Sequence, residues 1–175
     1  MVGLVLSDTF LLTASWDDND GDKVASGILQ IPFTESISSL LHDETELNAV
    51  LSSTLRQAKE ANPFEGQKIY VGLPDAFVEH SIVPVEKDLS NNDHLNYIQW
   101  LESQKGRSEK HSVYLFGQVY FPSEHSIHVC SISRALVRTL KLSISELGGS
   151  PHWLGPVSSL YLDGSGMSEA AMIHR

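Results

Sequence analysis

Cysteine, basic residues and long apolar runs are all scarce in this chain of 175 residues, and each scarcity excludes something. The single cysteine, Cys130, has no partner for an internal disulfide and predicts a reducing compartment. No stretch approaches the roughly 20 apolar residues of a membrane-spanning helix, and the first residues lack the pattern of a signal peptide. Lysine and arginine number 12 against 22 acids, a formal net charge of -10. We therefore expect a cytoplasmic protein that neither binds nucleic acid nor inserts into a membrane.

The sequence also lacks the common motifs of enzyme sites. It contains no Walker phosphate loop, no dinucleotide-binding glycine pattern and no GxSxG turn. Two of its eight histidines, His125 and His128, point to opposite faces of a predicted strand, which disfavours a zinc site. Cys130 lies on the same predicted strand and is interpreted as a small buried residue rather than a nucleophile. We predict no catalytic residue and no metal site.

The first 73 residues predict three strands, one helix and a fourth strand. The three strands cover Val2–Leu6, 9–16 and 23–31, with Asp20-Gly21 as a hairpin turn before the third. Apolar residues at helical spacing predict a helix over Glu44–Ala61, with Asp43 as its N-cap. A short apolar strand, Lys68–Leu73, follows. This order is typical of the ribonuclease-H-like core that actin-like proteins share, an α/β fold with a mixed sheet.

The middle of the chain predicts a second, smaller unit. Its expected elements are a strand over 77–85, a helix from the Ser90 cap to Gln104, strands over 113–121 and 126–132, and a helix over 134–147. This β-α-β-β-α order predicts an inserted two-layer subdomain. We therefore divide the chain into a core over 1–75, completed by about 153–175, and an insertion over 76–152.

The turn after the first strand lies where a nucleotide-binding fold places its phosphate loop. Such a strand usually ends in an acid that holds the metal, followed by a glycine that lets the backbone approach the phosphates. Val5 and Ser7 stand at the corresponding positions. Ser7, Asp8 and Thr9 form a degenerate loop in which one acid supplies little of a metal's coordination shell. A polar turn is the favoured interpretation, and a phosphate contact is the alternative.

Several local motifs resemble the PilM family, the actin-like cytoplasmic proteins of type IV pilus assembly related to platform proteins of type II secretion. The resemblance covers residues 2–162, which is the first half of such a protein. The segments that carry it are KIYVGLP at 68–74 with the strand that follows, YIQWLE at 97–102, the strand and helix over 127–149, and WLGPVSSL at 153–160.

The resemblance implies ATP binding between two lobes and docking of a short peptide from an inner-membrane pilus protein. Val5 and Ser7 depart from the family's phosphate loop, and the second lobe is absent from this sequence. We therefore expect a non-catalytic assembly protein that binds a protein or peptide of an inner-membrane platform and lies peripheral to that membrane through this partner. The alternative is an N-terminal fragment of an ATP-binding actin-like protein, in which ATP and Mg²⁺ bind only with a second lobe. A nuclease on the same scaffold is least favoured, because Val5 occupies the place of a metal-binding carboxylate.

Two other features have competing interpretations. The acidic residues 17–22 suggest calcium, but with Gly21 as the loop glycine the first ligand position falls on Trp16, so a solvated turn is favoured. The aromatic residues Tyr97, Trp100, Phe121 and Trp153 form either a partner-binding patch or ordinary core. The residues that bind a partner and the state of self-association stay open.

Overall fold

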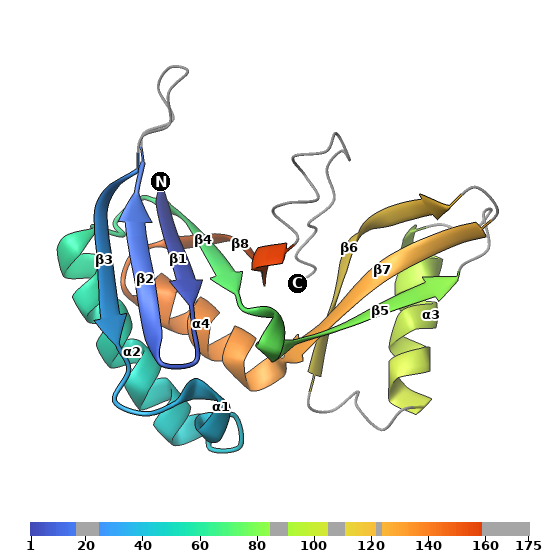
Figure 1. The fold of residues 1–175 in the computed structure, drawn as a ribbon, viewed down its shortest axis with the longest axis horizontal. Helices are drawn as coiled ribbons and strands as arrows, with labels where there is room; N and C mark the ends of the chain where they lie inside the picture. Colours follow the sequence, from blue (N-terminus) through green and yellow to red (C-terminus); the bar gives the residue numbers. More distant parts are fainter. Residues whose placement is uncertain (17–24, 85–90, 105–110, 122–123, 159–175) are drawn as a thin grey trace.

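The computed structural model describes residues 1–16, 25–84, 91–104, 111–121 and 124–158, which form two sheets and their helices (Figure 1). The larger sheet has the strand order β3-β2-β1-β4-β8, and the smaller has the order β5-β7-β6. The elements are β1 (Val2–Leu6), β2 (Phe10–Ser15), β3 (Ser26–Pro32), α1 (Ile37–Leu40), α2 (Glu44–Ala61), β4 (Lys68–Leu73), the 3-10 turn η1 (Asp75–Phe77), β5 (Val78–Pro84), α3 (Asn91–Gln104), β6 (His111–Phe121), β7 (Glu124–Ser133), α4 (Arg134–Glu146) and β8 (Ser150–Pro156).

The larger sheet is mixed. Strand β1 pairs antiparallel with β2, which pairs antiparallel with β3, whereas β4 runs parallel to both β1 and β8. The three parallel strands β1, β4 and β8 therefore end at the same edge of the sheet.

No described helix combines the length and apolar character needed to cross a membrane.

Helices α2 and α4 pack side by side and cover one face of this sheet (Figure 1). Their hydroxyls meet where Ser52 Oγ and Ser143 Oγ lie 2.9 Å apart. One continuous apolar cluster joins the two helices to the strands. Its fully buried members include Leu4, Leu6, Leu11, Leu47, Leu51, Leu55, Phe64, Ile69, Leu73, Leu136, Leu140 and Ile144. Helix α4, which follows the smaller sheet in sequence, thus packs with the core of the larger one.

Both ends of α2 are held by polar side chains. Asp43 Oδ1 accepts hydrogen bonds from the backbone N–H groups of Thr45 and Glu46, both at 3.0 Å, which is N-capping. At the other end Asn62 is buried, and its Nδ2 donates to Gly27 O at 2.8 Å and to Thr13 Oγ1 at 3.2 Å. Asn62 therefore links the end of α2 to the edge strand β3.

Aromatic rings lie over the opposite face of the larger sheet. The Trp16 ring rests on Gly3, where an added Cβ would come within 2.7 Å of Trp16 Cζ3. The centroid of the Trp16 ring lies 5.7 Å from that of Tyr70, and the Tyr70 centroid lies 5.1 Å from that of the His152 ring. A glycine at position 3 is what lets the Trp16 ring approach β1 this closely.

The smaller sheet is antiparallel, and α3 lies along it (Figure 1). Strands β5 and β7 pair over seven consecutive residues, while β6 shifts register between Leu115 and Gln118. Ile98 of α3 is fully buried, as are Val129 and, nearly so, Val83. These three residues are not part of the main apolar cluster.

Most predicted elements are confirmed, and α2 and β4 have the predicted bounds. Helix α1 and the turn η1 were not predicted, because four or three residues are too few to show a helical period. Strand β8 begins at Ser150, directly after Gly148, whose positive φ of 87° turns the chain out of α4. The boundaries at 76 and 152 stay predictions, and residues 159–175 lie outside the described part of the chain.

Candidate functional site

The carboxyl ends of the three parallel strands carry polar residues that are not needed for the core. Ser7 and Asp8 follow β1, Asp75 follows β4, and Ser158 comes shortly after β8. In open α/β sheets ligands bind outside these ends of the strands. This edge of the larger sheet is therefore the candidate site.

The carboxylate of Asp8 accepts hydrogen bonds from residues at the start of α1. Its Oδ1 accepts the Ser38 backbone N–H and its Oδ2 accepts the Ser36 hydroxyl, both at 2.8 Å. The Ser38 bond first, and the Ser36 bond second, hold the pKa of the Asp8 carboxyl below its ordinary value of 3.8. Both carboxylate oxygens thus anchor the start of α1.

Ser7 and Thr9, the other two predicted loop residues, are held through their backbones, Ser7 within the turn and Thr9 to the residue that follows β3. Ser7 N–H donates to Phe10 O at 2.8 Å, and Thr9 O accepts the Phe33 N–H at 2.9 Å. Val5 lies within β1, paired with Leu12 on one side and Gly72 on the other. A phosphate contact by Ser7, Asp8 and Thr9 stays a prediction.

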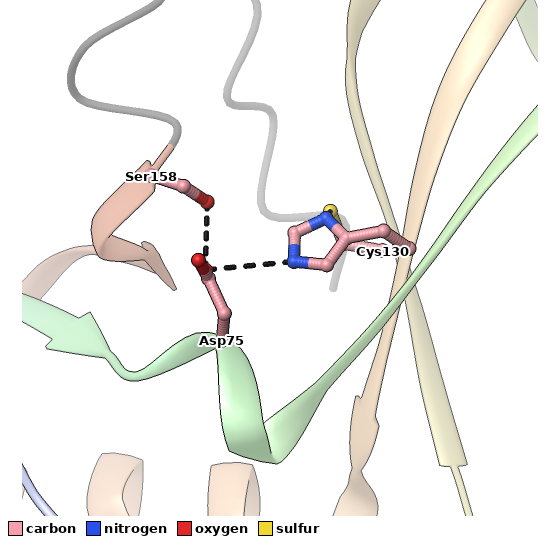
Figure 2. A network of polar contacts seen from close by, with 4 residues as sticks. Asp75, Cys130 and Ser158 are labelled. Carbon is pink, nitrogen blue, oxygen red and sulfur yellow. Dashed lines mark hydrogen bonds and ion pairs between the residues drawn. The ribbon is translucent and has the colours of Figure 1, made fainter.

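Asp75 is the centre of a second polar network (Figure 2). Ser158 Oγ donates to Asp75 Oδ1 at 2.7 Å, and His80 Nε2 lies 3.5 Å from the same oxygen. The other ring nitrogen, His80 Nδ1, is 3.4 Å from Cys130 Sγ. His80 on β5 and Cys130 on β7 are direct register partners. The network therefore joins the end of β8 and the turn after β4 to the smaller sheet.

The order cysteine, histidine, aspartate in this network is that of a nucleophile, a base and an orienting acid. Cys130 is completely buried, however, and burial first, with the charge of Asp75 second, raises the pKa of its thiol to about 12. A reactive cysteine needs the opposite shift, because the thiolate is the nucleophile. The arrangement is suited to connecting the two sheets rather than to attacking a substrate.

The predicted aromatic patch is divided between the two sheets. Tyr97 and Trp100 are exposed on α3 with their rings stacked, whereas Trp153 is half-buried on β8. The side chains of Phe121, His125 and His128 and the acidic run 17–22 lie outside what the structure describes. Among the described residues, no group of three or more histidine, cysteine or acidic side chains is placed to hold a metal.

Comparison with solved structures identifies this architecture. The chain is similar to the cytoplasmic domain of EpsL, an inner membrane component of the type II secretion system of Vibrio cholerae, with a TM-score of 0.50, 10% identity, and coverage of 87% of this chain and 54% of that one. It is also similar to a chain of the PilM-PilN type IV pilus biogenesis complex, with a TM-score of 0.56, 11% identity, and coverage of 89% and 46%. The fold is actin-like.

At this identity the likeness shows the fold alone. The chain spans about half the length of both structures. No family model and no curated protein matches the sequence. The activity and partners of the protein are therefore a matter for proposal.

Sequence reasoning did not single out Asp75, His80 or Ser158. Asp75 follows Pro74 at the end of a correctly predicted strand, which is a usable indication of a site at a strand end. Ser158 is 83 residues away from Asp75 in the sequence, and no short sequence motif indicates that two residues so far apart are hydrogen-bonded.

Proposed function

We propose that this protein is a non-catalytic, actin-like assembly protein that binds a partner of an inner-membrane platform for type IV pili or type II secretion. The observation that carries the proposal is the fold, shared with a chain of a pilus biogenesis complex and with the cytoplasmic domain of a secretion component. The protein would then be cytoplasmic and held at the inner membrane through its partner.

Two details of the β1–β2 turn support a role without nucleotide chemistry. The position of the metal-binding acid holds Val5, and the nearby Asp8 uses both carboxylate oxygens to anchor α1. A Mg²⁺–ATP complex would have to compete with these hydrogen bonds for the only acid of the turn. The proposal therefore expects no ATP binding by this chain.

Thermal unfolding with and without saturating Mg-ATP, followed by calorimetric titration, tests that expectation. A ligand at about 100 times its Kd stabilises the folded state by ~2.7 kcal/mol, which for a domain of this size raises Tm by roughly 5–10 °C. No shift supports the proposal. A shift of this size overturns the non-catalytic assignment and makes the protein an ATP-binding actin-like protein.

The partner is tested by titrating the purified chain with peptides from the cytoplasmic tails of platform membrane proteins encoded in the same genome. Saturable binding of one tail, and none of its scrambled version, supports the proposal. Failure of every tail while Mg-ATP is also without effect removes the pilus and secretion assignment and leaves the fold.

The second candidate is an N-terminal fragment of an ATP-binding protein whose second lobe is missing. The favouring observation is that the chain spans 54% and 46% of its two structural neighbours. This candidate predicts that the native product in cells is longer than 175 residues. Mass determination of the protein from its source tests this candidate, and a native product of this length would exclude it.

A further inference from the structure

Strand β3 is an edge strand of the larger sheet, and its side chains are largely exposed (Figure 1). Within the described part of the chain, β3 pairs with β2 alone. Ile28 is 66% exposed and Leu29 is 40% exposed, and as consecutive residues they point to opposite faces of the sheet. The backbone N–H and C=O groups on the outer side of an edge strand are a template for a further strand. The β3 edge is therefore a candidate contact surface.

The features that normally protect an edge strand from pairing lie only at the two ends of β3. Such features are charged side chains, prolines and irregular backbone. The strand has the sequence SGILQIP, without a charged residue, and its proline is the last residue. At the other end, Gly27 has a positive φ of 61° and its carbonyl oxygen accepts the Asn62 hydrogen bond. Residues 28–31, between these ends, contain no charged residue and no proline.

The neighbouring side of α2 continues this uncharged surface. Helix α2 packs against β3, and its Ser52 faces α4, where the Ser52 and Ser143 hydroxyls meet. The side of α2 away from α4 therefore borders the β3 edge. Val50 and Ala61 lie on that side, three helical turns apart, and both are at least partly exposed. We call residues 28–31 together with Val50 and Ala61 the β3 strip.

We propose that two copies of this chain associate by antiparallel pairing of their β3 strands, so that the two larger sheets become one continuous sheet. Two identical antiparallel strands are related by a two-fold axis, and each copy contributes the same residues to the contact. When this axis is perpendicular to the sheet, the α2 helices of both copies lie on the same face. The sides that carry Val50 and Ala61 then approach each other beneath the shared strands.

Charge selects a second copy in this orientation. Two chains with a net charge of -10 repel each other, so a contact between them requires a surface without charge, and the β3 strip is such a surface. The acidic residues 17–22 precede β3 in the sequence. Parallel pairing would bring the starts of both strands together, whereas antiparallel pairing puts them at opposite ends of the shared ladder. A strongly charged partner segment would find no opposite charge on residues 28–31.

The β3 strip lies at the edge of the larger sheet and not at the carboxyl ends of β1, β4 and β8. The inference goes beyond the proposed function, because pairing of two copies depends neither on nucleotide nor on the identity of the secretion or pilus system.

Sedimentation velocity of the full chain over a wide range of protein concentrations tests the proposal. We expect a reversible equilibrium that stops at the dimer, because a two-fold contact occupies the surface that forms it. Hydrogen exchange measured by mass spectrometry should slow in β3 as the concentration rises and stay unchanged in β5, an edge strand of the smaller sheet. A chain that stays monomeric at every concentration overturns the proposal, and so does growth into larger polymers.

Lysine substitutions in β3 locate the contact. Ile28→Lys and Leu29→Lys should each raise the Kd of the dimer at least about tenfold, because a lysine on an edge strand opposes strand pairing. Each substitution makes the net charge less negative, so weaker association would not come from greater overall repulsion. The matched control is Leu142→Lys on α4, which makes the same charge change at a side chain that is 52% exposed and should leave the Kd unchanged. Circular dichroism and Tm establish that each variant is folded.

An unchanged Kd in folded Ile28→Lys overturns the proposal. A tail peptide that binds to monomeric chain and binds less tightly to Ile28→Lys does so as well, because the edge would then receive the strand of a partner. The Mg-ATP and tail-peptide tests address the proposed function separately, so either conclusion can fail without the other.

Discussion

The two sheets of this protein differ in how they join the apolar core. The larger sheet shares one apolar cluster with α2 and α4, and among the side chains that the structure describes this cluster contains nearly all of the large buried ones. Helix α3 lies along the smaller sheet, and the buried Val83, Ile98 and Val129 of this unit are not part of that cluster. Since local stability follows buried apolar contact, the smaller unit should open more readily than the larger.

The smaller sheet is nevertheless anchored at one end. Val78 and Ile132 are register partners in β5 and β7, and both belong to the main cluster. Farther along β5, Ile82 is exposed. The unit is therefore held where its strands leave the core and is less constrained beyond that point.

The largest expected effect is the loss of stability caused by a core substitution, which should differ in extent between the two units. Leu55→Ala in α2 removes a fully buried side chain from the main cluster and should lower the free energy of unfolding by about 2–5 kcal/mol. Ile98→Ala should cost a similar amount locally, but only in the smaller unit. Hydrogen exchange measured by mass spectrometry should show faster exchange throughout Leu55→Ala, and in Ile98→Ala only in α3 and β5–β7. Equal loss of hydrogen-exchange protection in α2 of both variants would show that the two units unfold together as one cooperative unit. The smaller unit would then not open independently of the larger.

The next effect concerns a buried polar contact within the larger sheet. Asn62→Ala removes the donor to Gly27 O and Thr13 Oγ1 and should cost about 1–3 kcal/mol of unfolding free energy, because the buried Thr13 hydroxyl loses this partner. Urea unfolding measures it. The control is Gln57→Ala on the exposed side of α2, expected to change stability by less than about 0.5 kcal/mol. A cost as small as that of the control would mean that β3 is held by its pairing with β2 alone.

Helices were more predictable from the sequence than strands. The apolar period, Asp43 as a cap and Asn62-Pro63 as a stop define α2, and all three act within or next to the helix. In the smaller unit, strands β5, β6 and β7 begin or end one or two residues from their predicted bounds. Strands β2 and β3 of the larger sheet also differ from their predicted bounds of 9–16 and 23–31, so in both sheets the ends of strands were less visible in the sequence than those of helices.

The candidate site was less predictable because its partners are distant in sequence. Asp8 was identified as a turn residue, but its bonding to Ser36 and Ser38 depends on the unpredicted helix α1. The connection of Asp75 to Ser158 depends on β4 and β8 being neighbours, which only the sheet order reveals.

A smaller effect is expected from the network around Asp75, where loss of one hydrogen bond should change how fast the smaller sheet opens from the larger. Cys130 is the only cysteine and is fully buried, so its rate of labelling by a disulfide reagent measures opening of the smaller sheet. Ser158→Ala removes the 2.7 Å bond to Asp75 and should speed labelling roughly twofold to tenfold, which corresponds to one hydrogen bond. Ser39→Ala on α1 is the control and should leave the rate unchanged. An unchanged rate in Ser158→Ala would mean that this bond does not restrain the small sheet.

The smallest expected effect is a pH-dependent change in Tm. It tests whether the Asp8 carboxylate serves to anchor α1 rather than to bind a ligand. The folded-state pKa of Asp8 lies below its ordinary value of 3.8, so its contribution to stability is complete above about pH 5 and is lost as the pH falls through the folded pKa. Asp8→Asn keeps the size of the side chain and removes the charge. Its Tm should fall below that of the unmodified protein at neutral pH, and this gap should close as the pH falls. Glu60→Gln on exposed α2 controls for net charge, and a gap that persists in acid would mean that the Asp8 charge does not anchor α1.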